Sequence, residues 1–205
     1  GAAETDRVGK QPDKSMLQLH AEGALNALAD AGLNKNDIDG LFTAGPLIAQ
    51  LSEYLNITPS YADGTWAGGC TFLMLVQHAA AALTAGLCNV ALVTHGESGA
   101  SSVGLNGVFP RAHAPGSPSG QFEVPYGVSA PPNTWSLAAT RHMAVYGTTS
   151  EQLAAVAVAT RRWAVLNPRA FMKTPITVDD VLNSRMISDP LHLLDCCLRL
   201  DAGGA

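Results

Sequence analysis

The segment from residue 68 to residue 94 constrains the fold more than any other part of the chain. A glycine turn at residues 68–69 precedes Cys70, and an apolar stretch over residues 71–85 follows and ends at Gly86. A helix that is apolar on nearly all of its faces is expected to be buried. The continuous apolar run over residues 90–94 then predicts a buried parallel strand. A turn, a buried helix and a buried strand in this order indicate an α/β fold.

Weaker patterns predict the remaining elements. Apolar residues at three- and four-residue spacing (Leu17, Ala21, Ala24, Leu25 and Leu28) predict a helix over 15–31 that ends at Gly32. Thr149 and Gln152 form a capping-box pattern at the start of a predicted helix over 150–166. Further helices are predicted over 50–55, 135–146 and 177–183, strands over 41–44 and 57–61, and strand or loop from Met186 onward.

Residues 99–134 interrupt this pattern. The segment is rich in Pro, Gly and Ser, and it is too long and too irregular for an ordinary connection. Connections of this length are usually functional lids or disordered segments. We therefore expect a loop or lid region here that influences which ligand is bound.

Composition excludes several classes of protein. Apolar residues make up 47% of the chain and charged residues 14%, which argues against disorder. A net charge of −5 leaves no basic footprint for nucleic acid. No apolar stretch reaches transmembrane length, and no signal peptide is visible. The four cysteines lack C-x-x-C spacing, so we expect free thiols and a cytoplasmic location. We expect both chain ends to be truncation points rather than natural termini.

Cys70 is the candidate nucleophile. It follows Gly69 and begins a helix, where free N–H groups and partial positive charge favour a reactive thiolate. The glycines allow a close approach of backbone or substrate. The alternative is that Cys70 is a small apolar core residue, as most free cysteines are. The pattern alone leaves both readings open.

His95 is a second candidate because it directly follows the predicted buried strand. Ligands of open α/β sheets bind at the carboxyl ends of the strands. The alternative is a simple turn in which His95 is hydrogen-bonded and Glu97 is solvated.

His192, Cys196 and Cys197 are a weaker candidate set for a metal. His and Cys four residues apart on a helix can share an ion, but zinc sites usually have four ligands, or three and a water. The neighbouring leucines favour plain core packing instead. We therefore expect no metal site and no bound cofactor.

The stretch from Gly68 to Glu97 resembles the nucleophile helix and the following strand of thiolases. In that family the catalytic cysteine ends a loop, a buried helix ends in a glycine pair or Ala-Gly, and the next strand ends in a Gly-x-Glu type of turn. More specifically, the chain resembles the lipid-transfer, sterol-carrier branch. Supporting segments span nearly the whole chain: residues 1–5, 31–33, 38–41, 95–98, 146–148, 151–154, 167–170, 187–191 and 201–203.

The resemblance implies the N-terminal half of a thiolase-like fold, with a mostly parallel mixed sheet and helices on both faces. Residues 1–205 would form this domain, with the region 99–134 inserted. It also implies a homodimer and a coenzyme A thioester as substrate. The leading function that the resemblance implies is a thiolase-like acyltransferase that acts on lipid- or steroid-derived acyl-CoA. In it, Cys70 would attack a 3-ketoacyl-CoA and form an acyl-enzyme. Gly69 and His95 would lie near the thioester oxygen. Coenzyme A contacts are not marked by any motif.

The resemblance also leaves other functions open. Counted back from Gly86, the family's catalytic cysteine position falls on Gly69, one residue before Cys70. Members of this branch without the cysteine resemble retro-aldolases, which cleave a β-hydroxyacyl-CoA steroid side chain and work with an OB-fold (DUF35-type) partner. A third reading is a non-catalytic lipid- or acyl-CoA-binding protein. In both enzyme readings the remaining catalytic groups would lie beyond Ala205, so the fragment is expected to be inactive alone.

Overall fold

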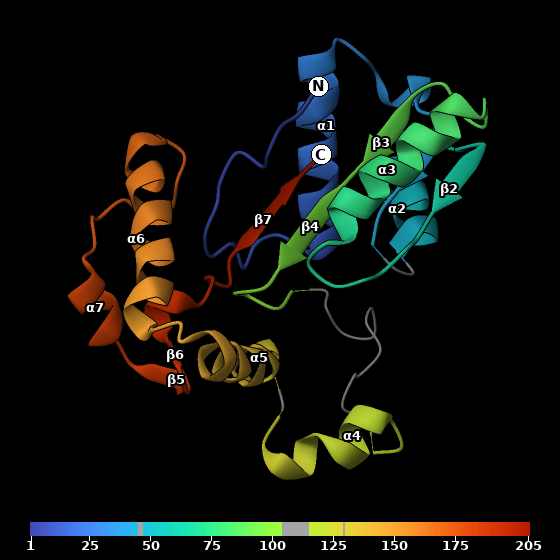
Figure 1. Ribbon diagram of the computed structural model, residues 1–205. Coiled ribbons are helices and arrows are strands. Elements are labelled where there is room, and N and C mark those ends of the chain that lie inside the picture. The colour runs from blue at the N-terminus through green and yellow to red at the C-terminus, as the bar shows by residue number, and fades with distance from the viewer. Residues whose placement is uncertain (45–46, 104–114, 129) are drawn as a thin grey trace. The chain divides into compact units, whose positions relative to one another are not determined.

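Figure 1 shows the computed structural model of the chain, which describes residues 1–44, 47–103, 115–128 and 130–205. The chain divides into two compact units. The first unit holds residues 1–110 together with residues 199–205, and the second unit holds residues 111–198. The last residues of the chain therefore return to the first unit after the second unit is complete.

A three-stranded parallel sheet lies at the centre of the first unit. Its strands are ordered β2 (Tyr61–Asp63), β1 (Gly40–Phe42) and β3 (Ala91–Val93). Both neighbours pair with β1 in parallel register. All three residues of β1 are buried, as expected for the central strand of a parallel sheet. A short 3₁₀ helix, Lys35–Asp37, precedes β1.

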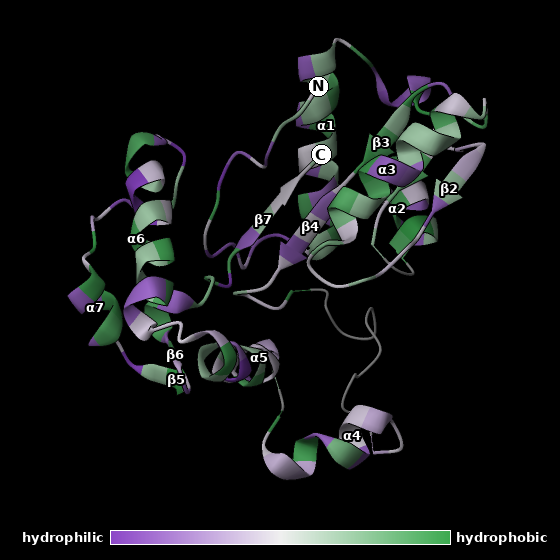
Figure 2. Ribbon diagram, viewed as in Figure 1, coloured by the Kyte–Doolittle hydropathy of each residue, from purple (hydrophilic) through white to green (hydrophobic). Residues whose placement is uncertain are grey.

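Helices cover both faces of this sheet, because successive side chains of β1 point to opposite sides. Leu41 lies in a buried cluster with α1 (Met16–Ala31) and α2 (Ile48–Leu55). Phe42 lies in a second cluster, with side chains of α3 (Thr71–Thr84). Figures 1 and 2 show these layers and the apolar residues along α3 and β3. The prediction of an α/β fold with a parallel sheet and helices on both faces is confirmed.

An antiparallel pair of strands, β4 (His95–Ser98) and β7 (Asp201–Gly204), packs against α1. The close approach requires glycine on both strands. A Cβ atom at Gly96 or Gly203 would lie 2.5 and 2.4 Å, respectively, from a backbone atom of α1. The predicted turn at residues 95–97 is therefore wrong: these residues form a strand, because β7 supplies a hydrogen-bonding partner from the far end of the chain.

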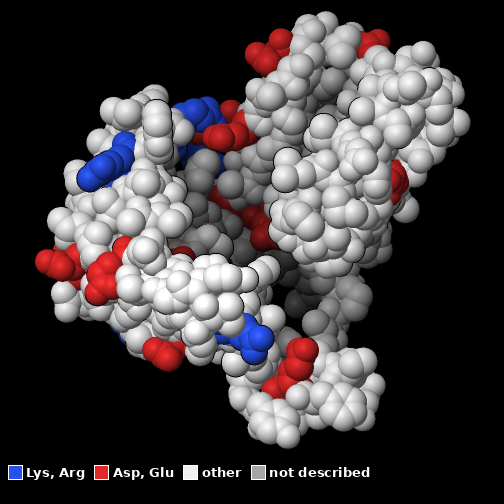
Figure 3. Space-filling model, viewed as in Figure 1, with Lys and Arg blue, Asp and Glu red and all other residues white. Residues whose placement is uncertain are grey.

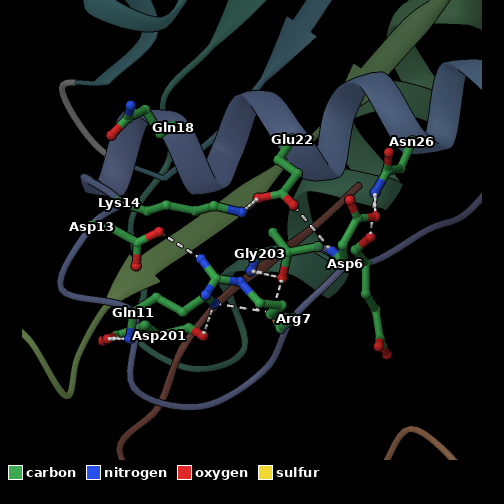
Figure 4. A network of polar contacts seen from close by, with 12 residues as sticks. Asp6, Arg7, Gln11, Asp13, Lys14, Gln18, Glu22, Asn26, Asp201 and Gly203 are labelled. Atoms are coloured by element: carbon green, nitrogen blue, oxygen red, sulfur yellow. Dashed lines mark hydrogen bonds and ion pairs between the residues drawn. The ribbon is translucent and has the colours of Figure 1, made fainter.

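Polar contacts join the N-terminal segment to α1 and β7 (Figure 4). Arg7 pairs with Asp13, and Lys14 pairs with Glu22 of α1. The buried Asp201 of β7 accepts a hydrogen bond of 2.6 Å from the backbone N–H of Gln11. These contacts hold the segment before α1 against α1 and β7.

The described residues of the second unit form helices and one small antiparallel pair of strands. Its longest helices are α5 (Pro131–Tyr146) and α6 (Ser150–Leu166), and the predicted capping box of Thr149 and Gln152 is present at the start of α6. The predicted helix over 177–183 is also present, as α7. The smaller elements are α4 (Pro118–Phe122), a 3₁₀ turn Val124–Tyr126, α7 (Val178–Leu182), β5 (Met186–Ser188), β6 (Leu191–His192) and a 3₁₀ turn Leu193–Asp195.

The expectation that α3 is buried all round is wrong for this chain. One face of the helix packs on the sheet through side chains such as Leu75 and Ala79. The opposite face is open, with Leu73 and Val76 exposed by 78% and 57%. Within this chain the sheet covers only one side of α3, so the apolar residues of its opposite face are exposed.

Three smaller predictions are also corrected. The second strand lies at residues 61–63 rather than 57–61, because Tyr61 and not Ile57 pairs with β1. Leu25 of α1 is half exposed rather than part of the buried face. Within the irregular region 99–134, residues 118–122 and 131–134 are helical, since Pro131 and Pro132 fit the first turn of α5. Residues 104–114 and 129 lie outside the described part.

Charged side chains are sparse on the described surface drawn in Figure 3, where uncharged atoms predominate. Among the described residues, no helix is both long enough and apolar enough to cross a membrane.

Candidate active site

The turn before α3 is held by Thr71. Its hydroxyl donates to the carbonyl of Gly68 (2.6 Å) and accepts from the backbone N–H of Ala67 (2.9 Å). Gly68 has φ +79°, a conformation that favours glycine. The turn therefore presents residues 69 and 70 at the N-terminal end of α3 in a fixed arrangement.

Gly69 and Cys70 differ in what surrounds them. A Cβ atom added at Gly69 would meet nothing within 4 Å, so this position opens onto free space. Cys70 is exposed, and its thiol lies 3.3 Å from the Ala67 carbonyl oxygen as a hydrogen-bond donor. The Cys70 thiol is thus hydrogen-bonded within the turn, whereas the space next to Gly69 holds no side chain.

His95 lies close to this turn through Phe72. The two rings have centroids 4.1 Å apart, and Phe72 is two residues from Cys70 on the first turn of α3. All three predicted site residues, Gly69, Cys70 and His95, lie in the first unit, and His95 follows the carboxyl end of β3. Burial lowers the pKa of His95, and the Glu97 carboxylate 3.7 Å away opposes this effect.

His20 of α1 stands behind His95 and was missed from the sequence. Its side chain is buried, and its ring meets that of His95 edge-on with centroids 5.9 Å apart. Burial, together with the neighbouring His95, lowers the pKa of His20 to about 3. Both imidazoles are therefore neutral at pH 7, and a neutral imidazole can donate one hydrogen bond and accept another. The signal was available, since His20 continues the four-residue spacing of Met16 and Ala24.

An Asp–His pair that joins β2 to α3 was also missed. Asp63 ends β2, and its Oδ2 lies 2.5 Å from Nδ1 of His78 on α3. Burial alone would raise the pKa of Asp63, but hydrogen bonds from Thr65 and the pairing with His78 outweigh it and hold the pKa below its ordinary value. The two residues are 15 positions apart, so only the packing of α3 on β2 brings them together.

His192, Cys196 and Cys197 are not arranged on one helix, as a shared metal site would have required. His192 ends β6, and Cys196 follows a 3₁₀ turn, so the two do not share one face of an α-helix. His192 Nδ1 instead lies 3.5 Å from the Asp195 carboxylate. All four cysteines are free thiols.

A parallel sheet between helices, with a glycine turn leading into the helix on one face, defines the class: this is an α/β protein with the thiolase-like fold. A solved SCP2-thiolase-like protein type 1 from Mycobacterium smegmatis shares the fold with a TM-score of 0.70. The match is 19% identical and covers 99% of this chain and 44% of that one. No protein-family model matches the chain.

More similar proteins narrow the class. The chain is 36% identical to a steroid side-chain-cleaving aldolase of Thermomonospora curvata, with 100% of this chain and 56% of that protein covered. It is 35% identical to a 17-hydroxy-3-oxo-4-pregnene-20-carboxyl-CoA lyase of Mycobacterium tuberculosis, with 100% and 55% covered. The solved Ltp2–ChsH2(DUF35) aldolase is 34% identical, with a TM-score of 0.86 and coverage of 100% and 53%.

The chain is therefore a homologue of thiolase-like enzymes of the steroid-aldolase and sterol-carrier branch, as the sequence predicted. An acetyl-CoA acetyltransferase of Methanothermobacter thermautotrophicus is also related, at 30% identity over the full chain. The chain spans about half the length of these relatives and corresponds to their N-terminal half.

Proposed function

We propose that this chain is part of an enzyme that cleaves a carbon–carbon bond of a β-hydroxyacyl-CoA by retro-aldol chemistry. The observation that carries the proposal is Gly69. The position at which the family's nucleophile would stand has no side chain and opens onto free space. The two relatives with the highest identities quoted above are an aldolase and a lyase, which supports the same reading.

Retro-aldol cleavage needs no cysteine. The β-hydroxyl loses its proton, a carbonyl forms, and the electrons of the broken bond pass to the α-carbon as an enolate of the thioester. The partial positive charge at the N-terminal end of α3 is suited to stabilise that thioester oxygen. His95, kept neutral by burial, is a second candidate donor. We expect the groups that move protons in the part of the relatives that this chain does not span.

The test uses the complete native protein with a β-hydroxyacyl-CoA and, separately, a 3-ketoacyl-CoA. Cleavage of the first substrate should survive Cys70→Ser with kcat/KM within about threefold, because the thiol has no role in this chemistry. A Cys88→Ser variant serves as a control for thiol loss elsewhere in the first unit. A hydroxylamine-labile acyl adduct on Cys70, together with loss of turnover in Cys70→Ser, would refute the proposal.

A thiolase-like acyltransferase is the second candidate. It is favoured by the exposed Cys70 at the N-terminal end of α3 and by the related acetyltransferases. In this reading Cys70 forms an acyl-enzyme that coenzyme A then releases, and the adduct described above would support it. Binding of acyl-CoA without turnover of either substrate would leave the third reading, a non-catalytic carrier.

The partner and assembly are also proposals. The solved aldolase is a complex of Ltp2 with ChsH2(DUF35). By analogy we expect a DUF35-type OB-fold subunit to copurify with the complete protein, and we expect a cytoplasmic homodimer. Affinity purification of the native protein followed by size-exclusion chromatography with light scattering would test both expectations. The assignment of residues 1–205 to one domain with a lid at 99–134 stays a prediction.

A further inference from the structure

The ring of His95 contacts one ring from each of two helices. Phe72, in the first turn of α3, has its ring centroid 4.1 Å from that of His95. His20 of α1 meets His95 edge-on, with centroids 5.9 Å apart. The side chain of His20 is buried, whereas that of His95 is 32% exposed. His20 therefore lies on the buried side of the His95 ring.

The two ring nitrogens of His95 have different surroundings. Nδ1 is buried and has no hydrogen-bond partner among the residues that the structure describes. Nε2 lies 3.7 Å from Oε1 of the partly exposed Glu97, which is too far for a hydrogen bond. Because Nδ1 is buried and the side chain is partly exposed, Nε2 is the ring nitrogen that a ligand can reach.

These surroundings determine which nitrogen of the neutral ring carries the proton. A neutral imidazole has one N–H donor and one acceptor nitrogen. A proton on Nδ1 would be buried without an acceptor, and the lone pair of Nε2 would then face the Glu97 carboxylate, which repels it. A proton on Nε2 avoids both costs. The accessible nitrogen of His95 is therefore a hydrogen-bond donor rather than a base.

The ring of His20 is itself held in place by β4 and the residue before it. The Thr94 hydroxyl donates to the carbonyl oxygen of His20 (3.3 Å) and lies 3.4 Å from its Nδ1. Gly96 packs closely against the ring, since a Cβ atom there would lie 2.9 Å from Cδ2 of His20. The His20 ring therefore has little freedom to move away from His95.

We propose that His95 donates a hydrogen bond from Nε2 to the thioester oxygen, and that His20 is a positioning residue that shields Nδ1 of His95 from water. This inference rests on the proposed carbon–carbon chemistry, because it assigns roles within the same site. His20 does not touch the substrate and acts through the ring of His95. Removal of its side chain would leave a void next to Thr94 and His95, whose polar atoms a water could bind.

Nitrogen-15 NMR of the complete native protein, with labelled histidine, tests the role of His95. His95→Gln assigns the His95 signals. We expect the Nε2–H tautomer in the free protein. We also expect the Nε2 signal to shift on binding of a saturated acyl-CoA, which has the thioester but no β-hydroxyl and so cannot be cleaved. The Nδ1–H tautomer, or an Nε2 signal that does not respond to the bound acyl-CoA, would overturn the proposal.

This result is independent of turnover. If no β-hydroxyacyl-CoA is cleaved, the proposed function fails, whereas the response of Nε2 to the bound thioester still decides the role of His95. If cleavage is observed but Nε2 does not respond, the proposed function stands and this inference fails.

Substitutions of His20 test the positioning role. His20→Ala should raise the pKa of His95 toward its ordinary value, because burial is what lowers that pKa and water would now reach Nδ1. The Glu97 carboxylate, which opposes the effect of burial, is the same in all the variants. Cleavage by His20→Ala should lose about tenfold or more in kcat with KM within about threefold, because the donor acts mainly on the enolate oxygen.

His20→Leu fills a similar volume and should keep both the pKa of His95 and kcat near their wild-type values. His142→Leu is the control for loss of a histidine, since His142 is exposed and lies in the second unit. His20→Val replaces His20→Ala if that variant does not fold. An unchanged pKa of His95 with unchanged kcat in the smaller variant, or equal losses in His20→Leu, would overturn the positioning role.

Discussion

Replacement of Asp201 by Asn should destabilise the first unit strongly. The Asp201 side chain is buried, and its carboxylate accepts hydrogen bonds from the N–H of Gln11 (2.6 Å), the N–H of Ala100 (2.8 Å) and both the N–H (3.0 Å) and hydroxyl (2.5 Å) of Ser101. Figure 4 shows the contact to Gln11. Burial alone would raise the pKa of Asp201, but these hydrogen bonds outweigh it and lower the pKa from 3.8 to about 2.

The magnitude follows from that difference. One pKa unit corresponds to about 1.4 kcal/mol, so the ionised carboxylate contributes roughly 2–3 kcal/mol to the free energy of unfolding. An Asn amide keeps one acceptor oxygen, but its NH₂ group faces the N–H of Gln11, donor against donor. We expect Asp201→Asn to lose about the same 2–3 kcal/mol at pH 7, measured by urea unfolding followed by circular dichroism.

The pH dependence gives an independent check. Because the folded pKa is depressed, the contribution of Asp201 is fully present above about pH 4 and is lost as the pH falls toward 2. The difference between wild type and Asp201→Asn should therefore shrink by about half at pH 3. Asp13→Asn is the control, because Asp13 forms an exposed pair with Arg7 and its loss should be undetectable. A stability difference below about 0.5 kcal/mol at pH 7, or one that stays constant down to pH 3, would refute the reasoning.

Two further predictions concern close packing at a glycine and the capping of a helix. Gly96→Ala should lower the free energy of unfolding by about 1–3 kcal/mol or more, because its Cβ would lie 2.5 Å from the backbone nitrogen of His20. Gly69→Ala should be tolerated, since its Cβ would meet nothing within 4 Å. Thermal unfolding compares the two variants, and equal losses of stability would contradict the packing described. Thr149→Ala should cost about 1 kcal/mol by removing the cap on the Gln152 N–H, with Thr149→Ser as the retaining control in urea unfolding. An unchanged Thr149→Ala would show that this cap does not stabilise α6.

Local signals in the sequence predicted much of the fold. The glycine after residue 31 and the capping residues around 149–152 placed α1 and α6 within a residue or two of their ends, because caps act through contacts only a few residues apart. The strand at 95–98 was missed because its partner begins at Asp201, about a hundred positions away. No local sequence pattern predicts the pairing of two strands that lie so far apart in the chain.

The same distinction applies to the candidate site. Cys70 and His95 were found because each follows a readable element, a glycine turn or an apolar strand. His20 and the Asp63–His78 pair were not found, because their significance depends on what packs around them. The burial of α3 was overestimated for a related reason: composition reports how apolar a helix is, but not how many neighbours cover it.

The register of Gly69 and Cys70 shows where sequence and geometry have to be combined. Cys70 is the N-cap of α3 and Gly69 precedes it outside the helix, so a thiol displaced by one position has different surroundings. At position 70 the thiol lies against the carbonyl of Ala67, and at position 69 an added side chain would enter open space. A cysteine side chain at position 69 would therefore occupy space that the thiol of Cys70 does not reach. Open space at that position suits a substrate with a bulky carbon next to the bond to be cleaved, and it is a stronger argument for the aldolase reading than the presence of Cys70 is for the thiolase reading.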